Sequence, residues 1–295
     1  MQKVEEFHAE RITTATPRWT VACGMICVAS GADRPLNTTN VRAGTRITMD
    51  FETLRERALA YREQLLARKD KIAPADFGWY PYDTMANIFH LDALLSGPQR
   101  QVFDRIAGTR IADIGAADGD FGFFLEDELG CEVDLIDNAP TNFNGLRGAR
   151  RLVEELPSRA QVHEIDLDAQ FRMPADHYGA VFFLGLLYHL KNPFLVLERL
   201  AERAELCFVS TRIAQVAPDG TRIADQPVAY LLDPAEANND ATNFWIFSET
   251  GLRRIFDRTG WEVVDFTTVG CQEDSDPRTP DRDERAFALL RSRKV

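Results

Sequence analysis

The stretch Ile111-Ala112-Asp113-Ile114-Gly115-Ala116-Ala117-Asp118-Gly119-Asp120 carries the clearest structural signal in this chain. A short apolar run ends in an acidic residue and continues into small residues, which allow the backbone to turn tightly and to approach a ligand closely. A helix is predicted after the turn, and its first amide groups would point toward that ligand. A dinucleotide-binding turn of the G-x-G-x-x-G type requires glycine at 115, 117 and 120, but residues 117 and 120 are Ala and Asp. The stretch therefore predicts a strand, a ligand-binding turn and a helix, and it disfavours a nicotinamide dinucleotide.

Strands and helices alternate from Arg110 to the C-terminus. The predicted strands lie at 111–114, 132–137, 162–166, 180–184, 206–210, 261–267 and 286–290, and helical stretches separate most of them. Alternation of this kind is typical of an α/β fold in which helices cover both faces of a largely parallel, doubly wound sheet. Ligands of such folds bind at the carboxyl ends of the strands.

The chain before the first predicted strand has a different organisation. A helix is predicted from Asp50 onward, because apolar residues recur there at helical spacing, and a second helix is predicted over about 84–95. We therefore divide the chain into a leader of uncertain order (1–48), an N-terminal helical cap (49–108) and a main domain (109–295). Residues 211–248 form a long insertion in that domain, and a connection of this length favours a lid or an acceptor site.

Acidic residues end the second and third predicted strands. Asp137 lies 18 residues beyond Gly119, close to the roughly 20 residues expected for an acid that binds ribose hydroxyl groups. Asp166 follows the third strand, although Asp168 could take the same role. The alternative for Asp113, Gly115 and Gly119 is an ordinary turn before a capped helix, and the ordered acids make a cofactor site the stronger interpretation.

The pattern Asp-x-Gly-x-x-x-Gly at 113–119 resembles the first motif of the class I S-adenosylmethionine (SAM)-dependent methyltransferases, with Ala117 in place of the usual middle glycine. Residues 185–193 (Gly-Leu-Leu-Tyr-His-Leu-Lys-Asn-Pro) resemble a signature of the methyltransferases related to the tRNA wobble-uridine carboxymethyl-transfer enzymes. The aromatic block at 79–82 and the segment at 238–245 are similar to that group too. The resemblance extends from about Asp50 to the end. It implies a Rossmann-like sheet of seven strands, one of them antiparallel, and SAM as cofactor.

The resemblance also implies roles for individual residues. Asp166 and Leu167 would lie beside the adenine. On physical grounds, an aromatic face near the sulfonium would gain a cation–π attraction, and a packing seam between the cap and the core explains Trp79, Tyr80 and Tyr82 equally well. Asp118 is as well explained by capping of the following helix as by cofactor contact. The residues expected to bind the cofactor are Asp113, Gly115, Ala117, Gly119, Asp137, Asn138, Asp166, Leu167, Leu184, Trp79 and Tyr80.

Tyr188 and His189 are the candidate catalytic residues, because they follow the fourth strand, where donor and acceptor should meet. Histidine is the usual proton carrier near neutral pH. The alternative is that His189 orders the loop and Tyr188 packs on the cofactor. The residues expected to bind the acceptor are Tyr82, Asn239, Asn243 and Trp245, and for these a purely structural role in packing or turns is nearly as well supported.

The charge distribution bears on the substrate. Residues 1–110 carry 15 basic and 13 acidic residues, whereas residues 111–295 carry 19 and 33, and the net charge is −12. An acidic main domain would repel a phosphate backbone, so we expect a small-molecule acceptor rather than nucleic acid. A tRNA-modifying (carboxy)methyltransferase is the main alternative. An enzyme that uses SAM without transferring its methyl group, a dinucleotide-dependent oxidoreductase and a catalytically silent binding domain are the others.

The remaining sequence features exclude several classes of protein. No run of 18 apolar residues is present and the N-terminus lacks the basic start of a signal peptide, so we expect a cytoplasmic protein without a membrane segment. Cys23 and Cys27 have no second pair to complete a zinc site, and the five cysteines are best explained as reduced thiols. No metal site is therefore predicted. The sequence does not indicate the oligomeric state.

Overall fold

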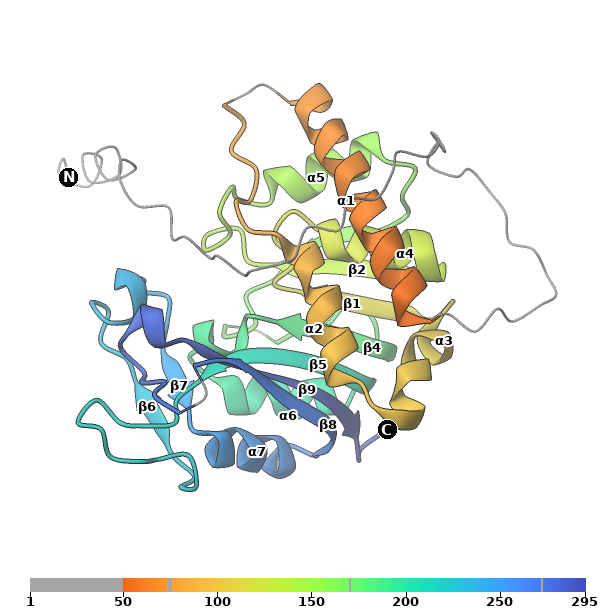
Figure 1. Ribbon diagram of the computed structural model, residues 1–295. Coiled ribbons are helices and arrows are strands. Elements are labelled where there is room, and N and C mark those ends of the chain that lie inside the picture. The colour runs from red at the N-terminus through yellow and green to blue at the C-terminus, as the bar shows by residue number, and fades with distance from the viewer. Residues whose placement is uncertain (1–49, 74–75, 170, 272) are drawn as a thin grey trace. The chain divides into compact units, whose positions relative to one another are not determined.

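A mixed sheet of nine strands runs through the part of the chain that the structure describes (Figure 1). The structure is a computed structural model that describes residues 50–73, 76–169, 171–271 and 273–295. The strands are β1 (Arg110–Ile114), β2 (Glu132–Asp137), β3 (Gln161–Glu164), β4 (Tyr178–Leu184), β5 (Ala204–Ile213), β6 (Ala229–Leu231), β7 (Trp245–Phe247), β8 (Trp261–Gly270) and β9 (Glu284–Ser292). The predicted leader (1–48), with Cys23 and Cys27, lies outside the described residues.

The strand order is β3-β2-β1-β4-β5, and all neighbours in this half are parallel. Strand β9 runs antiparallel between β5 and β8. These seven strands confirm the predicted Rossmann-like sheet with one antiparallel strand. The two further strands, β6 and β7, pair with each other inside the 211–248 insertion, and β7 joins β5 only at Ile213 and Phe247. Three-residue strands are too short to produce an alternating pattern, so the sequence did not predict them.

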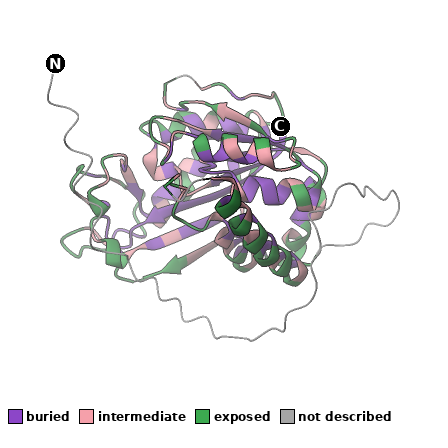
Figure 2. Cartoon of the chain, turned by 90° about the horizontal axis from the view of Figure 1, so that it is seen from above, coloured by how far each residue is buried: buried purple, intermediate pink, exposed green. Residues whose placement is uncertain are grey.

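Helices cover both faces of the sheet. They are α1 (Phe51–Ile72), α2 (Asn87–Leu94), α3 (Val102–Ile106), α4 (Asp120–Leu129), α5 (Arg147–Glu155), α6 (Pro193–Ala201) and α7 (Glu249–Arg258), with short 3-10 turns η1 (Thr84–Ala86), η2 (Gly97–Gln101), η3 (Leu187–His189), η4 (Ala237–Asn239) and η5 (Pro280–Arg282). Helices α6 and α7 lie on one face, and α1 to α4 lie toward the other (Figure 1). Seen from above, burial is concentrated in the strands and exposure on the outer sides of the helices (Figure 2). No helix in the described part of the chain is long and apolar enough to cross a membrane.

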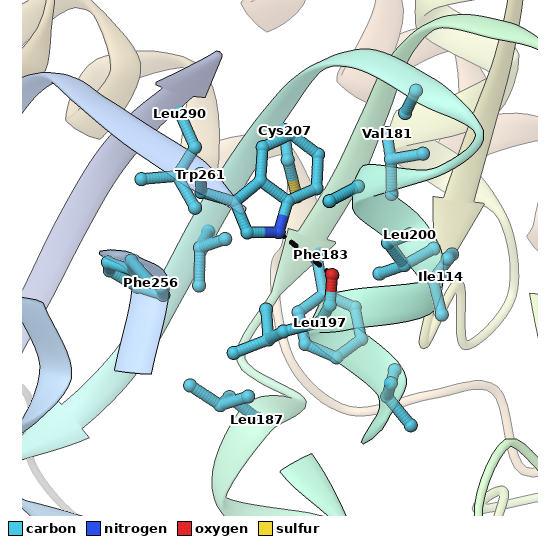
Figure 3. Packing of buried hydrophobic residues seen from close by; sticks show 14 of the residues in the cluster. Ile114, Val181, Phe183, Leu187, Leu197, Leu200, Cys207, Phe256, Trp261 and Leu290 are labelled. Atoms are coloured by element: carbon cyan, nitrogen blue, oxygen red, sulfur yellow. Dashed lines mark hydrogen bonds between the residues drawn. The ribbon is translucent and has the colours of Figure 1, made fainter. Parts of the chain in front are cut away.

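The core on the α6–α7 face is centred on Trp261, whose side chain is almost fully buried (Figure 3). Its indole N–H donates to the carbonyl oxygen of Leu197 at 2.9 Å, so the one polar atom of the ring is satisfied. Phe183 and Cys207 from the central strands and Phe256 from α7 belong to the same cluster. This packing secures β8 and β9 to the parallel half of the sheet.

The opposite face is packed by aromatic rings. Phe182 of β4 and Phe208 of β5 stack with their centroids 4.7 Å apart, and Phe103 of α3 stacks on both. Helix α1 begins where the sequence predicts, and its N-cap residue Asp50 accepts a hydrogen bond from the amide of Thr53 at 2.8 Å. The division of the chain at residues 48 and 108 stays a prediction.

Candidate functional site

The turn between β1 and α4 lies at the carboxyl end of the parallel strands, as the sequence predicts. Gly115 and Gly119 both have positive φ, at +77° and +86°, a region that residues with a Cβ rarely adopt. A Cβ on Gly119 would lie 2.7 Å from a methyl group of Leu135, so a larger residue would have to displace that side chain as well as strain the backbone. Ala117 also has positive φ, at 55°, and therefore accepts strain at the place where glycine is usual.

Asp137 connects this turn to the end of β2. Its Oδ2 accepts hydrogen bonds from the Ala117 amide and from Nδ2 of Asn142, both at 2.9 Å, and its Oδ1 accepts one from the Asn138 amide at 2.7 Å. Burial raises the pKa of Asp137 despite these donors. These hydrogen bonds therefore orient the carboxylate. It lies at the carboxyl end of β2, where a ligand that crosses the strand ends would contact it.

Asp113 lies beneath the turn and is almost completely buried. Burial, and then the negative charge of Asp137, raise its pKa to about 7. A Cβ on Gly122 of α4 would lie 3.1 Å from Oδ2 of Asp113, so glycine at 122 leaves room for this carboxylate. A buried and a half-buried carboxylate that repel each other create a site that suits a positively charged ligand. SAM carries a net positive charge, because its sulfonium and ammonium groups together exceed the charge of its carboxylate, and it therefore suits this site.

Asp118 is not the helix cap that the sequence allowed, because Gly119 occupies the N-cap position of α4 without a side-chain bond. Instead Asp118 accepts hydrogen bonds from the Tyr80 amide at 2.8 Å and from Asn144 at 2.7 Å. Nζ of Lys69 lies 3.3 Å from Asp118 and 2.7 Å from Asp120, and all three side chains are buried or nearly so. This cluster joins α1, the aromatic block and the turn.

The three aromatic residues of the block have different surroundings. The Trp79 ring lies against Phe77, and the Lys69 ammonium lies 5.0 Å from the Trp79 ring centre. The Tyr80 and Tyr82 rings meet edge to face at 5.4 Å. Burial raises the pKa of Tyr80 to about 12, with Tyr188 as the next contributor. Tyr82 is two-thirds exposed. The pKa of Tyr80 is thus raised in part by groups at the strand ends, among them Tyr188 and Asp137.

The third strand ends earlier than the sequence predicts. Strand β3 stops at Glu164, so Asp166 lies in the loop beyond it, exposed, while Leu167 is buried in the core. Asp168, the alternative to Asp166, accepts hydrogen bonds from the amides of Lys191 and Asn192, both at 2.8 Å. Each oxygen of Asp168 thus holds an amide at the start of α6, whereas the exposed Asp166 accepts one hydrogen bond, from the Asp168 amide at 2.9 Å. Asp166 therefore has the less engaged carboxylate of the two.

Tyr188 and His189 lie in η3, directly after β4, which ends at Leu184. Their rings are 4.3 Å apart. Nδ1 of His189 lies 3.1 Å from the carbonyl oxygen and 3.0 Å from Oγ1 of Thr242. The Tyr188 carbonyl accepts a hydrogen bond from the Phe244 amide at 2.8 Å. The insertion is therefore joined to the loop that carries the candidate catalytic residues.

The predicted acceptor residues of the insertion are not equivalent. Asn243 is buried, and its Nδ2 donates to the Ala237 carbonyl at 3.0 Å, while its Oδ1 is buried without a partner among the described residues. Trp245 is half-buried, and its indole N–H points to the Lys191 carbonyl at 3.4 Å. Asn239 is exposed and has positive φ. The Asn243 amide group thus supports the segment around Ala237 through its nitrogen, while its oxygen accepts no hydrogen bond from the described residues.

The structure adds residues that the sequence did not single out. Arg285 of β9 lies with its guanidinium carbon 5.7 Å from the Tyr188 ring centre, and its Nε lies 3.1 Å from Asp283. No sequence motif marks Arg285, because a single arginine on a distant strand belongs to no recognisable pattern. Asn142, five residues after Asp137, is not part of a motif either. Among the described residues, no group of three potential ligands could hold a metal ion.

Comparison with known proteins identifies the family. A family model described as a methyltransferase domain matches residues 57–265, which is more than half of the chain. The chain belongs to the methyltransferase domain family. This methyltransferase therefore uses SAM as its cofactor, as the turn, the paired carboxylates and the sheet topology indicate. The finer resemblance to the wobble-uridine enzymes stays a hypothesis.

Solved structures show how far the fold of this methyltransferase is shared. A structure of coclaurine N-methyltransferase bound to N-methylheliamine and SAH is 14% identical, with 83% of this chain and 96% of that chain covered and a TM-score of 0.50. The N-terminal domain of EvdMO1, crystallised in the presence of SAH and D-fucose, is 15% identical, with 79% and 97% covered and a TM-score of 0.48. The methyltransferase spans 48% of the longer EvdMO1 chain. The likeness to the coclaurine N-methyltransferase structure, at 14% identity, concerns the fold alone. A search of curated proteins finds no match.

Proposed function

We propose that this methyltransferase transfers the methyl group of SAM to an oxygen or nitrogen atom of a small polar molecule. The observation that carries the proposal is the position of Asp137, whose carboxylate is held by the turn amide of Ala117 at the end of β2. In this proposal Asp137 accepts hydrogen bonds from the ribose, with Asn138 beside it. Asp166 and Leu167 lie at the adenine.

The remaining cofactor contacts follow from placing the ribose at Asp137 and the adenine at Asp166 and Leu167. The methionine part of SAM would lie over the turn, near the buried Asp113 and toward Leu184 at the end of β4. When bound, SAM supplies a methyl group on a positively charged sulfur. The backbone of the glycine-rich turn and the aromatic block at 79–80 would orient it, so that the acceptor atom meets the methyl group in line and at near-contact distance.

The acceptor would bind where the aromatic block, η3 and the insertion approach the strand ends. Tyr82 and Trp245 offer aromatic faces, and Oδ1 of Asn243, which is buried without a partner among the described residues, would accept a hydrogen bond if the acceptor reached it. Asn239 lies at the exposed rim of the same insertion. Polar and aromatic groups of this kind suit a small polar molecule better than a nucleic acid backbone, which the acidic main domain would repel.

One observation favours a second candidate. The aromatic block lacks a basic residue that could hold a carboxylated form of SAM, but Arg285 lies beside Tyr188 and carries a positive charge at the strand ends. Transfer of a carboxymethyl group from such a donor is therefore the second candidate. Substitution Arg285→Met should weaken binding of carboxylated SAM and leave binding of SAM itself unchanged; an equal effect on both would argue against this donor.

The main proposal is tested by calorimetric titration with SAH. Asp137→Ala should weaken SAH binding by more than about 1 kcal/mol, or roughly fivefold, because a half-buried hydrogen-bond acceptor is lost. Glu164→Ala, which removes an exposed carboxylate at the end of β3, should leave the affinity unchanged. Thermal unfolding without SAH separates a binding effect from a folding effect. Unchanged affinity in Asp137→Ala, or binding of NAD(P) without binding of SAH, would overturn the proposal.

A further inference from the structure

A chain of three polar side chains ends at His189. Oδ1 of Asp240 accepts hydrogen bonds from the Thr242 amide at 2.9 Å and from the Thr242 hydroxyl at 2.6 Å. The Thr242 Oγ1 and the Thr242 carbonyl oxygen both lie within hydrogen-bond distance of Nδ1 of His189, at 3.0 and 3.1 Å. The insertion thus contacts the imidazole through two oxygen atoms of one residue.

The direction of these hydrogen bonds follows from the chemistry of each group. A carboxylate only accepts hydrogen bonds, so the Thr242 hydroxyl donates its proton to Asp240 and presents a lone pair to His189. The Thr242 carbonyl oxygen can only accept. Both oxygens near Nδ1 are therefore acceptors, and Nδ1 must carry a proton. In a neutral imidazole the lone pair then lies on Nε2.

The surroundings of the ring favour the neutral form. Burial lowers the pKa of His189 below its ordinary value, and the Arg285 guanidinium acts in the same direction. The contact with Thr242 and the carboxylates of Asp240 and Asp137 oppose these effects without reversing them. No described residue makes a hydrogen bond to Nε2 of His189. Its lone pair is therefore not used by the described residues.

We propose that Asp240 and Thr242 are positioning residues that hold His189 as the Nδ1–H tautomer, so that Nε2 accepts the proton of a hydroxyl acceptor during methyl transfer. This inference rests on the proposed function. In the step, the acceptor O–H bond breaks and an Nε2–H bond forms, while a C–O bond forms and the C–S bond of SAM breaks. The products are a methyl ether, SAH and an imidazolium ion that later releases its proton to water.

The tautomer is measured by long-range ¹H–¹⁵N correlation spectra of the full chain loaded with SAH at about pH 7. His189→Gln assigns the signals of His189, and the exposed His177 gives a reference for an imidazole outside the site. We expect the Nδ1–H pattern for His189 in the unsubstituted protein. An Nε2–H pattern, or a doubly protonated ring, would overturn the proposal.

Two variants test the positioning residues. In Asp240→Ala the Thr242 hydroxyl loses its acceptor and becomes free to donate to Nδ1, so an Nε2–H population should appear. Asp240→Ala with Thr242→Val removes that donor and leaves only the carbonyl, so the Nδ1–H pattern should return. An Nδ1–H pattern that persists unchanged in Asp240→Ala would contradict the role of Asp240. SAH titration of each variant is the separate readout of the proposed function, because cofactor binding does not depend on the tautomer.

Discussion

Asp113 and Asp137 lie near the carboxyl ends of the neighbouring parallel strands β1 and β2, and the charge of Asp137 raises the pKa of Asp113. Asp137 accepts hydrogen bonds from the turn amide of Ala117 and from Asn142, whereas Asp113 is buried with the negative charge of Asp137 nearby. Burial disfavours the ionised form of both groups. A site of this kind is unfavourable for the ligand-free protein and favourable for a cation, which is a physical reason for it to bind SAM.

The titration of Asp113 gives a prediction at the scale of a single residue. Its pKa is raised to about 7, first by burial, whereas the unfolded chain would have the ordinary value. The folded state therefore binds the proton more tightly, so the contribution of the protonated group to stability is complete below about pH 4 and is lost as the pH rises through about 7. Asp113→Asn does not titrate. Relative to the unsubstituted protein, this variant should gain free energy of unfolding between about pH 5 and pH 8, with about 4 kcal/mol as the upper bound.

Urea unfolding across this pH range measures the difference. Glu164→Gln, the same acid-to-amide substitution at an exposed carboxylate on β3, is the control for the substitution itself. If the difference between Asp113→Asn and the unsubstituted protein stays constant across the range, the pKa of Asp113 is not raised.

Helix α1 shows how an element outside the sheet shapes the site. Its apolar positions recur at helical spacing through Leu65, and the next position on that face is Lys69 rather than an apolar residue. The ammonium meets Asp118 and Asp120 at the start of α4, and Asp118 in turn holds the Tyr80 amide. The helix therefore positions the aromatic block through a buried ionic cluster as well as through apolar packing.

Lys69→Met tests this cluster at the scale of the element. The substitution keeps the length of the side chain but leaves two buried carboxylates without their cation, and removing one partner of a buried ion pair costs about 3–5 kcal/mol. Lys71→Met on the exposed side of the same helix is the matched control and should change stability by less than about 0.5 kcal/mol. Chemical unfolding measures both. Adding Asp120→Asn should recover part of the loss, and equal stability of the two single variants would show that the cluster has no structural role.

Charge acts at the scale of the whole molecule. The chain carries a net charge of −12, and the excess of acidic residues lies in 111–295, which contains all of the sheet except Arg110, the first residue of β1. Any polyanionic substrate would have to approach against this field. A small acceptor experiences it much less, because contacts within the site dominate its binding.

The field predicts weak binding of tRNA. Fluorescence anisotropy with labelled tRNA should give a Kd above about 100 µM at physiological salt, and lowering the salt should not reveal a tight complex. A basic RNA-binding domain measured in the same buffer serves as the positive control. Tight, salt-dependent binding would instead support the resemblance to the wobble-uridine enzymes and remove the preference for a small acceptor.

The sequence by itself determined the approximate positions of the seven long strands and of most helices, the glycine-rich turn and the acids that follow the strands. These features depend on neighbours a few residues apart, and spacing along the chain expresses them directly. Only the tertiary structure decided that Lys69 meets Asp118, that Thr242 orients His189 and that Arg285 lies beside Tyr188. Each of these pairs is separated by about 50 residues or more, so its formation depends on how the sheet brings distant segments together. The short strands β6 and β7 were also decided by the tertiary structure alone. They form because β6 pairs with β7 and β7 pairs with β5, and no local sequence pattern marks them.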